Sequence, residues 1–169
     1  QILADFMTIK EKKKKLKGLK ITWIGDGNNV CNSMIYGAAL SGVKISIATP
    51  KGFEPNKTIV KDAKKLTTVE LTTDPFVAVK NADVVVSDTF SSIHNLDKKR
   101  LKKFLPKYQV NSKLMSAAKK DAIFMHCLPA KRGEEVTSDV IDGVQSVVWD
   151  EAENRLHTQK ALLVSLIHA

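Results

Sequence analysis

Residues 19–29 read LKITWIGDGNN, and this stretch decides the fold. The segment from Leu19 to Ile24 is short and rich in β-branched and aromatic residues, which is typical of a buried strand. Gly25-Asp26-Gly27-Asn28-Asn29 then breaks the strand, and Val30 to Leu40 has the pattern of a helix that ends near Gly42. A strand, a glycine turn and a helix together predict the first half of a βαβ unit.

The same alternation continues along the chain. Further strands are predicted at residues 43–48, 69–71, 82–87, 122–125 and 145–149, and further helices near residues 56–65, 96–104, 112–119 and 136–141. Asp74 is placed to cap a short helix that begins with Pro75. Strands that alternate with helices predict an α/β fold, a doubly wound and mostly parallel sheet with helices on both faces, which is a Rossmann-like architecture.

Two helices are expected to flank this sheet domain. Apolar residues recur with helical spacing between Gln1 and Leu16, and Gly18 supplies a stop. The last helix is expected from Glu151 to His168. The predicted organisation is therefore a helix in residues 1–18, a sheet domain in residues 19–150 and a C-terminal helix in residues 151–169.

Composition excludes several classes of protein. The chain has 169 residues, 43% of them hydrophobic, which is enough for one domain with a substantial core and argues against disorder. It has no apolar run of membrane-spanning length and no secretory signal pattern, so we expect neither membrane insertion nor secretion. Two cysteines are too few for a disulfide scaffold or a Cys-based zinc site, and a reducing, cytoplasmic location fits best.

The charge leaves two interpretations open. Lys and Arg number 27 against 18 Asp and Glu, a net charge of +9, and seven of the lysines lie in residues 10–20, KEKKKKLKGLK. The segment is either a solvated helix end whose cations suit the helix dipole, or a contact for nucleic acid or an anionic membrane. Aromatic residues do not interleave the lysines, so stacking on single-stranded nucleic acid has little support.

Polar clusters follow three of the predicted strands directly, at residues 25–29, 88–94 and 126–132. The carboxyl ends of parallel strands share one edge of a sheet, where doubly wound folds bind their ligands. The sequence therefore predicts a ligand site at this edge.

The first cluster invites a dinucleotide interpretation but fails the fingerprint. Val30 stands at the third glycine position, and no acidic residue follows the second strand in Ala48-Thr49-Pro50. We therefore expect no nicotinamide cofactor, and no other cofactor is indicated. Either Asn28 or Asn29 is expected to cap the next helix, which leaves the other amide for a polar ligand.

The other clusters each allow two roles. Asp88 either binds an ammonium group or caps the next element, and Cys127 is either a nucleophile or a small buried apolar residue. His126 is best explained as a packed, hydrogen-bonded side chain, and the four histidines show no metal-ligand spacing. Arg155 either pairs with Glu151 or holds a phosphate.

Three motifs occur together, namely residues 25–29 (GDGNN), 126–136 (HCLPAKRGEEV) and 150–155 (DEAENR). In this order the chain resembles the ornithine carbamoyltransferase family, in particular its C-terminal, ornithine-binding half. Residues 1–5 (QILAD) resemble the end of the family's His-Pro-x-Gln-Ile-Leu-Ala-Asp stretch. The family's carbamoyl-phosphate domain, with its Ser-Thr-Arg-Thr loop, has no counterpart here, and the two flanking helices resemble those that join the two domains.

The resemblance implies transfer of a carbamoyl group from carbamoyl phosphate to the δ-amine of ornithine, in arginine biosynthesis and by a trimer. It implies an ornithine site that includes Asn29, Asp88, Ser92 and Ile93. Gln1, Cys127, Leu128 and Arg155 would contact carbamoyl phosphate, with Cys127 and Asp88 catalytic. The isolated chain is expected to fold but to be inactive, because half of the phosphate site lies in the other domain.

One motif departs from the family pattern. The usual Asp-Thr-Trp-x-Ser-Met-Gly appears here as residues 88–94, DTFSSIH. Because this loop helps to choose the amine, putrescine or an acylated ornithine is an alternative substrate. A non-catalytic, basic nucleic-acid-binding domain is the alternative from a different class, and it predicts binding that weakens steeply with salt.

Overall fold

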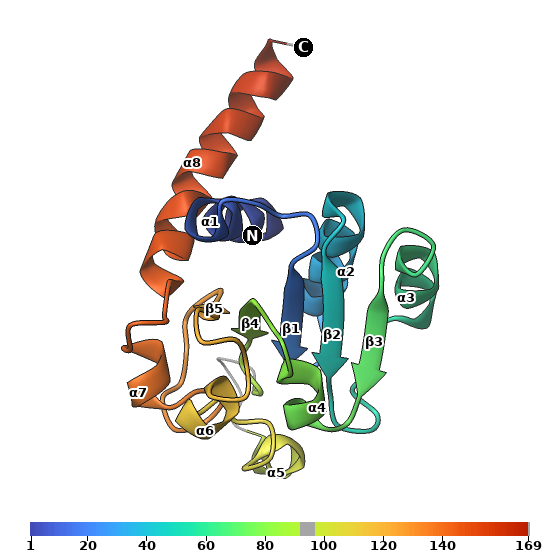
Figure 1. Cartoon of the computed structure of the whole chain (residues 1–169), viewed down its shortest axis with the longest axis vertical. Helices are drawn as coiled ribbons and strands as arrows, with labels where there is room; N and C mark the ends of the chain where they lie inside the picture. Colours follow the sequence, from blue (N-terminus) through green and yellow to red (C-terminus); the bar gives the residue numbers. More distant parts are fainter. Residues whose placement is uncertain (92–96, 169) are drawn as a thin grey trace.

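The predicted first strand and helix form β1 (Lys20–Ile24) and α2 (Asn29–Ser41). The computed structural model describes residues 1–91 and 97–168. Over these residues the sheet has five parallel strands in the order β3-β2-β1-β4-β5, with β2 at Lys44–Ala48, β3 at Val69–Thr72, β4 at Val84–Ser87 and β5 at Ile123–His126 (Figure 1). The chain winds outward from β1 to β3 and returns to the other side at β4. The topological switch point therefore lies between β1 and β4.

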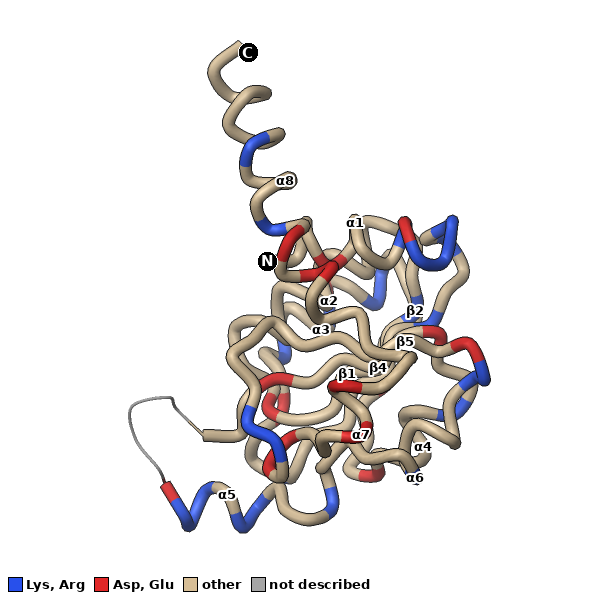
Figure 2. The backbone as a smooth tube through the Cα atoms, turned by 90° about the vertical axis from the view of Figure 1, so that its left-hand side faces the viewer, with Lys and Arg blue, Asp and Glu red and all other residues tan. Residues whose placement is uncertain are grey.

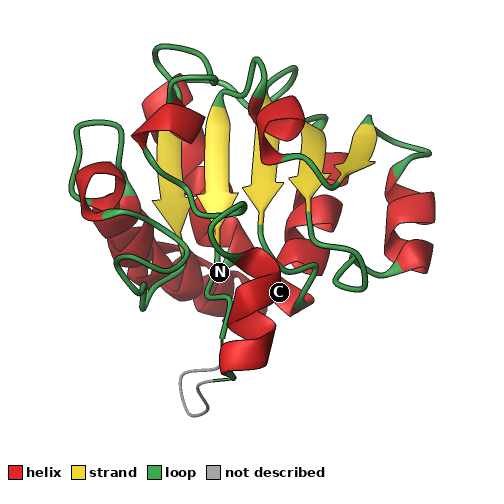
Figure 3. Ribbon diagram, turned by 90° about the horizontal axis from the view of Figure 1, so that it is seen from below, coloured by secondary structure: helices red, strands yellow, loops and turns green. Residues whose placement is uncertain are grey.

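Helices cover both faces of the sheet (Figure 3). The helices α1 (Ile2–Lys13), α2 and α3 (Lys57–Ala63) contribute to one hydrophobic core. The second core contains residues of α4 (Pro75–Val79), α5 (Lys98–Phe104), α6 (Ser112–Met115), α7 (Ser138–Ile141) and the start of α8 (Val148–Ile167). The predicted doubly wound α/β fold is confirmed.

The strands β4 and β5 and most of β1 are buried on both sides, as a continuous apolar pattern requires, whereas the edge strand β3 is partly exposed. In β4, Val84 and Val86 point into the first core, whereas Val85 points into the second. In β1, Trp23 joins the first core and Ile24 the second, and both are fully buried. The two-residue period of a strand thus divides each segment between two layers of helices.

Local signals set several helix ends. Asn28 caps α2 by accepting a hydrogen bond from the N–H of Cys31 (3.0 Å), and Asp74 caps α4 by accepting one from Phe76 (2.9 Å). The helix α1 ends earlier than predicted, because Lys14 adopts a left-handed conformation (φ 62°) and its N–H bonds to Lys10. The helix α6 is also shorter than predicted and ends at Met115.

The predicted sixth strand at residues 145–149 is wrong. Ser146 forms a single bridge with Phe124 beside β5, supported by backbone hydrogen bonds from Phe124 to Gln145 and from Val147 to Phe124. The helix α8 then begins at Val148. The segment is β-rich, but the ladder ends after one bridge because the following residues enter the first helical turn.

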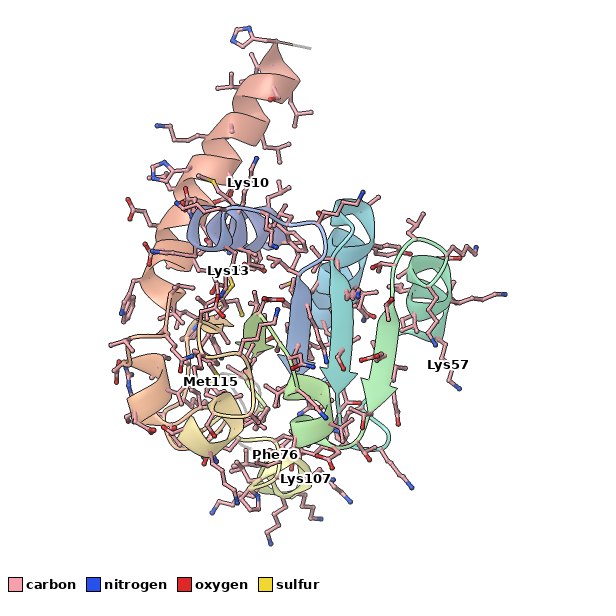
Figure 4. The ribbon with its side chains drawn as sticks, in the orientation of Figure 1. Lys10, Lys13, Lys57, Phe76, Lys107 and Met115 are labelled. Carbon is pink, nitrogen blue, oxygen red and sulfur yellow. The ribbon has the colours of Figure 1, made fainter. Side chains whose placement is uncertain are left out.

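Two lysines of the lysine-rich segment pair with acidic residues of the same chain. Lys12 pairs with Asp150 (2.8 Å), and Lys13, labelled in Figure 4, pairs with Asp121 (2.9 Å). Figure 2 shows basic residues both at this end of α1 and along α5, with acidic residues between them. Across residues 1–91 and 97–168, no helix combines the length and the apolar character needed to cross a lipid bilayer.

Candidate functional site

Three loops meet at the carboxyl ends of β1, β4 and β5, which are neighbours in the sheet. They carry Asn28, Asp88 and Cys127, respectively. The Nδ2 group of Asn28 donates to Oδ2 of Asp88 (2.7 Å), and the Cys127 thiol donates to Oδ1 of Asp88 (3.3 Å). The predicted convergence of the three clusters is therefore present, and Asp88 lies at its centre.

The two asparagines differ in role. Asn28 caps α2 with its oxygen while its amide nitrogen holds Asp88, so one side chain links the helix start to the carboxylate. Asn29 is exposed, and its side chain forms no hydrogen bond with the described residues. Asn29 is thus the asparagine that is left for a polar ligand.

Asp88 does not cap a described helix. Its Oδ1 accepts a hydrogen bond from the neighbouring N–H of Thr89 (2.7 Å), and its other contacts are Asn28 and Cys127. All three partners donate to the carboxylate and fix its position where the loops meet. An ionised carboxylate held in this way suits a cationic amine.

Burial raises the pKa of the Cys127 thiol well above its usual value, and the negative charges of Asp88, Glu151 and Asp5 raise it further. The thiol therefore keeps its proton at neutral pH and donates it in the hydrogen bond to Asp88. A protonated thiol is a poor nucleophile. This environment makes Cys127 poorly suited to act as a thiolate.

Gln1 and Arg155, which the resemblance assigns to carbamoyl phosphate, lie together. The Nη1 group of Arg155 donates to Oε1 of Gln1 (2.7 Å). The Nε group of Arg155 is buried and has no partner among the described residues. The guanidinium thus retains donors for an anion.

His126 is packed inside the protein, as predicted. Its Nδ1 accepts a hydrogen bond from the N–H of Leu128 (2.9 Å), and its Nε2 lies 3.4 Å from Oε1 of Glu135. Both side chains are fully buried. Glu135 also accepts a hydrogen bond from the N–H of Lys131 (2.6 Å). These contacts fix the turn that carries Cys127, in which Leu128 has a φ of 54°.

Sequence reasoning missed Arg100, which clamps two of the site loops. Its Nε donates to the carbonyl of Phe90 (2.7 Å), its Nη2 pairs with Asp26, and its guanidinium lies 4.9 Å from the centre of the Phe53 ring. Phe90 in turn stacks on Phe104, with 4.7 Å between ring centres. No motif singles out this arginine, because it stands in a lysine-rich helix and its partners are distant in sequence.

A second contact ties the loop after β4 to the loop after β5. The Nζ group of Lys131 donates to Oγ of Ser91 (2.8 Å). Ser92 and Ile93, which were predicted to contact ornithine, lie outside the described residues. In the described part of the chain, no group of three or more His, Cys, Asp or Glu side chains is arranged to hold a metal ion.

Comparisons with known proteins agree with this geometry. Residues 17–166 match the family model described as "Aspartate/ornithine carbamoyltransferase, Asp/Orn binding domain". The chain is 64% identical to the ornithine carbamoyltransferase of Cenarchaeum symbiosum over 98% of its own length and 55% of that protein's. A relative from Thermoplasma volcanium, 53% identical over 99% of this chain and 57% of its own, is named a catabolic ornithine carbamoyltransferase.

A solved structure gives the same result. The ornithine carbamoyltransferase of Pyrococcus furiosus superposes with a TM-score of 0.91 and 49% identity, over 96% of this chain and 54% of that one. The chain thus spans about half the length of the relatives it matches. Both the sequence match and the superposition cover the sheet and the three loops at its edge. The chain accordingly belongs to the aspartate/ornithine carbamoyltransferase family, as its Asp/Orn-binding domain.

Proposed function

We propose that this chain is the ornithine-binding half of an enzyme that transfers a carbamoyl group from carbamoyl phosphate to the δ-amine of ornithine. The products are citrulline and phosphate. The observation that carries the proposal is the position of Cys127. Its thiol donates a hydrogen bond to Asp88 on one side, and the negative charges of Glu151 and Asp5, on the other side, raise its pKa. A candidate amine site and a candidate carbamoyl site therefore adjoin at one turn.

On the amine side, Asp88 binds the δ-ammonium group of ornithine and accepts its proton. This assignment is supported by the three donors that hold the carboxylate in place. Asn29 contacts the α-carboxylate or α-amino end, and Ser92 and Ile93 complete the site. The deprotonated amine is then a nucleophile, because its lone pair is no longer bound to a proton.

On the phosphate side, Arg155 binds carbamoyl phosphate and Gln1 contacts the carbamoyl group. The backbone carbonyls of Cys127 and Leu128 accept hydrogen bonds from the carbamoyl NH₂ and orient it. The buried, unpartnered Nε of Arg155 supports a role in anion binding.

In the transfer step, the amine nitrogen forms a bond to the carbamoyl carbon, and the bond from that carbon to the phosphate oxygen breaks. The second proton of the attacking amine passes to the departing phosphate, since Asp88 already holds the first. The electron pair of the broken bond leaves with the phosphate, whose growing charge Arg155 stabilises. The Cys127 thiol keeps its proton and holds the Asp88 carboxylate by donating to it. Closure of two domains on both substrates would exclude water and align the reacting atoms.

The remaining part of the phosphate site is assigned to a second, carbamoyl-phosphate-binding domain. The segments 1–18 and 151–169, which contain α1 and most of α8, are the connections to the sheet domain in residues 19–150. Apolar side chains in the second half of α8 support this division, because they are between 46% and 75% exposed; they are Leu162, Leu163, Val164, Leu166 and Ile167. In Figure 1 this half of α8 extends away from the sheet.

We further assign the enzyme to the cytoplasm, to a trimeric assembly and to arginine biosynthesis. Both cysteines are unpaired, which suits a reducing compartment. A catabolic role is the alternative, since one relative carries that name. Rescue of an arginine auxotroph that lacks the transferase tests the biosynthetic role, and failure to rescue despite activity in vitro would favour the catabolic one.

The central test is citrulline formation by the complete two-domain enzyme with carbamoyl phosphate and ornithine. We expect turnover of ornithine, with the isolated 169-residue chain inactive as the control. Putrescine and acylated ornithine are assayed in parallel, because the loop at residues 88–94 departs from the family pattern. Turnover of only another amine would keep the reaction and change the substrate, whereas a folded enzyme inactive with every amine would refute the proposal.

A further inference from the structure

Two buried carboxyl groups lie directly behind Gln1 and have no role in the mechanism above. Asp5 in α1 is 2% exposed, and Glu151 in α8 is 1% exposed. The Nε2 group of Gln1 lies 2.7 Å from Oδ1 of Asp5 and 3.0 Å from Oε1 of Glu151. The second oxygen of Glu151, Oε2, accepts a hydrogen bond from the N–H of His126 (2.9 Å). The pair therefore touches both Gln1 and the strand end that leads to Cys127.

These contacts determine which way the Gln1 amide faces. A glutamine amide has two N–H donors on its nitrogen and two lone pairs on its oxygen. Asp5 and Glu151 take both donors, and Arg155 donates to the oxygen. The reverse orientation would place the amide oxygen against two carboxyl groups and the NH₂ group against a guanidinium. Gln1 is thereby left with one lone pair on Oε1 and no donor for a ligand.

We propose that Asp5 and Glu151 are positioning residues that hold Gln1 as a pure hydrogen-bond acceptor, and that this makes the site select a carbamoyl group over an acetyl group. The inference rests on the carbamoyl transfer proposed above. A carbamoyl NH₂ can donate to Oε1 of Gln1, whereas the methyl group of acetyl phosphate cannot. A polar partner left without a hydrogen bond discriminates strongly between ligands of equal shape.

The two carboxyl groups lie close together, since both contact the amide nitrogen of Gln1. Burial raises the pKa of Glu151 well above its usual value, and the adjacent Asp5 carboxyl raises it further. The positive charges near the pair are the amino group of Gln1 and Arg155, which lies on the far side of the Gln1 side chain.

The first test replaces Glu151 by Gln in the complete enzyme. An amide at residue 151 has one acceptor oxygen in place of two, so it loses either Gln1 or His126. We expect carbamoyl phosphate to bind about tenfold more weakly by calorimetry, which corresponds to one lost hydrogen bond. Binding of acetyl phosphate and inorganic phosphate should change less than about twofold, since neither offers an N–H to Gln1. Glu153→Gln, an exposed carboxylate in the same helix, is the matched control.

Two further comparisons separate positioning from folding. In the Gln1→Ala background, Glu151→Gln should weaken carbamoyl phosphate binding no further, because residues that act as one unit are not additive. Asp5→Asn should keep the selectivity, since its oxygen can accept from Gln1 and its NH₂ can donate to Glu151. Asp5→Leu should lose it. The comparison of Asp5→Asn with Asp5→Leu tests the inference even if the Glu151 variant does not fold.

Three results would overturn the inference. They are equal weakening of all three phosphate ligands by Glu151→Gln, full additivity with Gln1→Ala, and equal selectivity of the Asp5→Asn and Asp5→Leu enzymes. Activity of the unsubstituted enzyme is measured first. An enzyme that transfers no carbamoyl group would refute the proposed function, whereas an active enzyme with any of these results would refute only the role of the carboxyl pair.

Discussion

At the scale of single residues, the environment of Asp88 decides the chemistry. Its carboxylate accepts hydrogen bonds from Asn28, Thr89 and Cys127, which come from two different loops and its own chain neighbour. These donors hold the carboxylate in one position where the loops after β1, β4 and β5 meet. The proposed role of Asp88 in binding and deprotonating the amine depends on this placement.

Replacing Asp88 by Asn in the complete enzyme removes that charge while keeping the shape of the side chain. We expect kcat/KM for ornithine to fall by about 100-fold or more, the usual effect of losing a positioned general base. Steady-state kinetics at saturating carbamoyl phosphate measure the change. Asp62→Asn, at an exposed position in α3, is the control. Unchanged binding and turnover would mean that Asp88 only orders the loop.

Cys127 gives a prediction about reactivity. Because burial and Asp88 raise the pKa of its thiol, we expect slow alkylation of this chain by iodoacetamide at pH 8. The rate should be at least about tenfold below that of glutathione, because the thiolate is the reacting form. Mass spectrometry of the labelled peptide measures it. Rapid labelling that levels off below pH 9 would show a thiolate and would make Cys127 a candidate proton acceptor beside Asp88.

At the scale of elements, a close approach of two backbones holds the β1–α2 loop in place. The N–H of Gly27 donates to the carbonyl of Phe53 (2.8 Å). A Cβ atom added at Gly27 would lie 2.2 Å from the backbone nitrogen of Pro55. The glycine therefore allows the loop after β2 to press against the loop that carries Asn28.

Gly27→Ala should lower the free energy of unfolding by more than about 2 kcal/mol, because overpacking against backbone forces both loops to move. Urea unfolding of this chain measures the change. The matched control is Gly52→Ala, where the added Cβ meets open space and only the φ of 86° opposes the substitution, at a cost of about 1 kcal/mol. Equal losses for the two variants would show that the close approach has no energetic weight.

At the scale of the whole molecule, α1 and α8 come from opposite ends of the chain and pack against each other beside the sheet (Figure 1). Their contact buries Asp5, whose pKa rises from 3.8 to about 6 through burial, with Gln1, Glu151 and Arg155 opposing part of the rise. A raised acid pKa means that the folded state holds a proton that the unfolded state has released. The contribution of Asp5 to the stability of the folded chain is therefore lost as pH rises from about 4 to about 6.

Asp5→Asn should remove that cost. We expect the variant to be more stable than the original chain at pH 8, by up to about 3 kcal/mol, and the difference should disappear below pH 4. Urea midpoints of both chains at pH 3.5, 6 and 8 measure it. Asp62→Asn should show the opposite sign, since Lys65 lowers the pKa of that exposed carboxyl. A variant less stable than the original at every pH would contradict the assigned burial cost.

The sequence by itself determined the features that depend on near neighbours. The alternation of apolar residues, the caps at Asn28 and Asp74 and the breaks after each strand predicted the sheet, its helices and the edge that carries the site. A family resemblance added the roles of Gln1, Asp88 and Arg155. The inferences about the fold succeed because periodicity and capping act over a few residues, whereas the residue roles remain predictions.

Only the tertiary structure decided the rest. It shows that Asn28 rather than Asn29 holds Asp88, that the Cys127 thiol donates to Asp88, and that residues 145–149 form one bridge instead of a strand. It also brings Gln1 to Glu151 across 150 positions of the chain. Burial, protonation and pairing depend on groups that are distant in sequence, and no local pattern records which of them will meet.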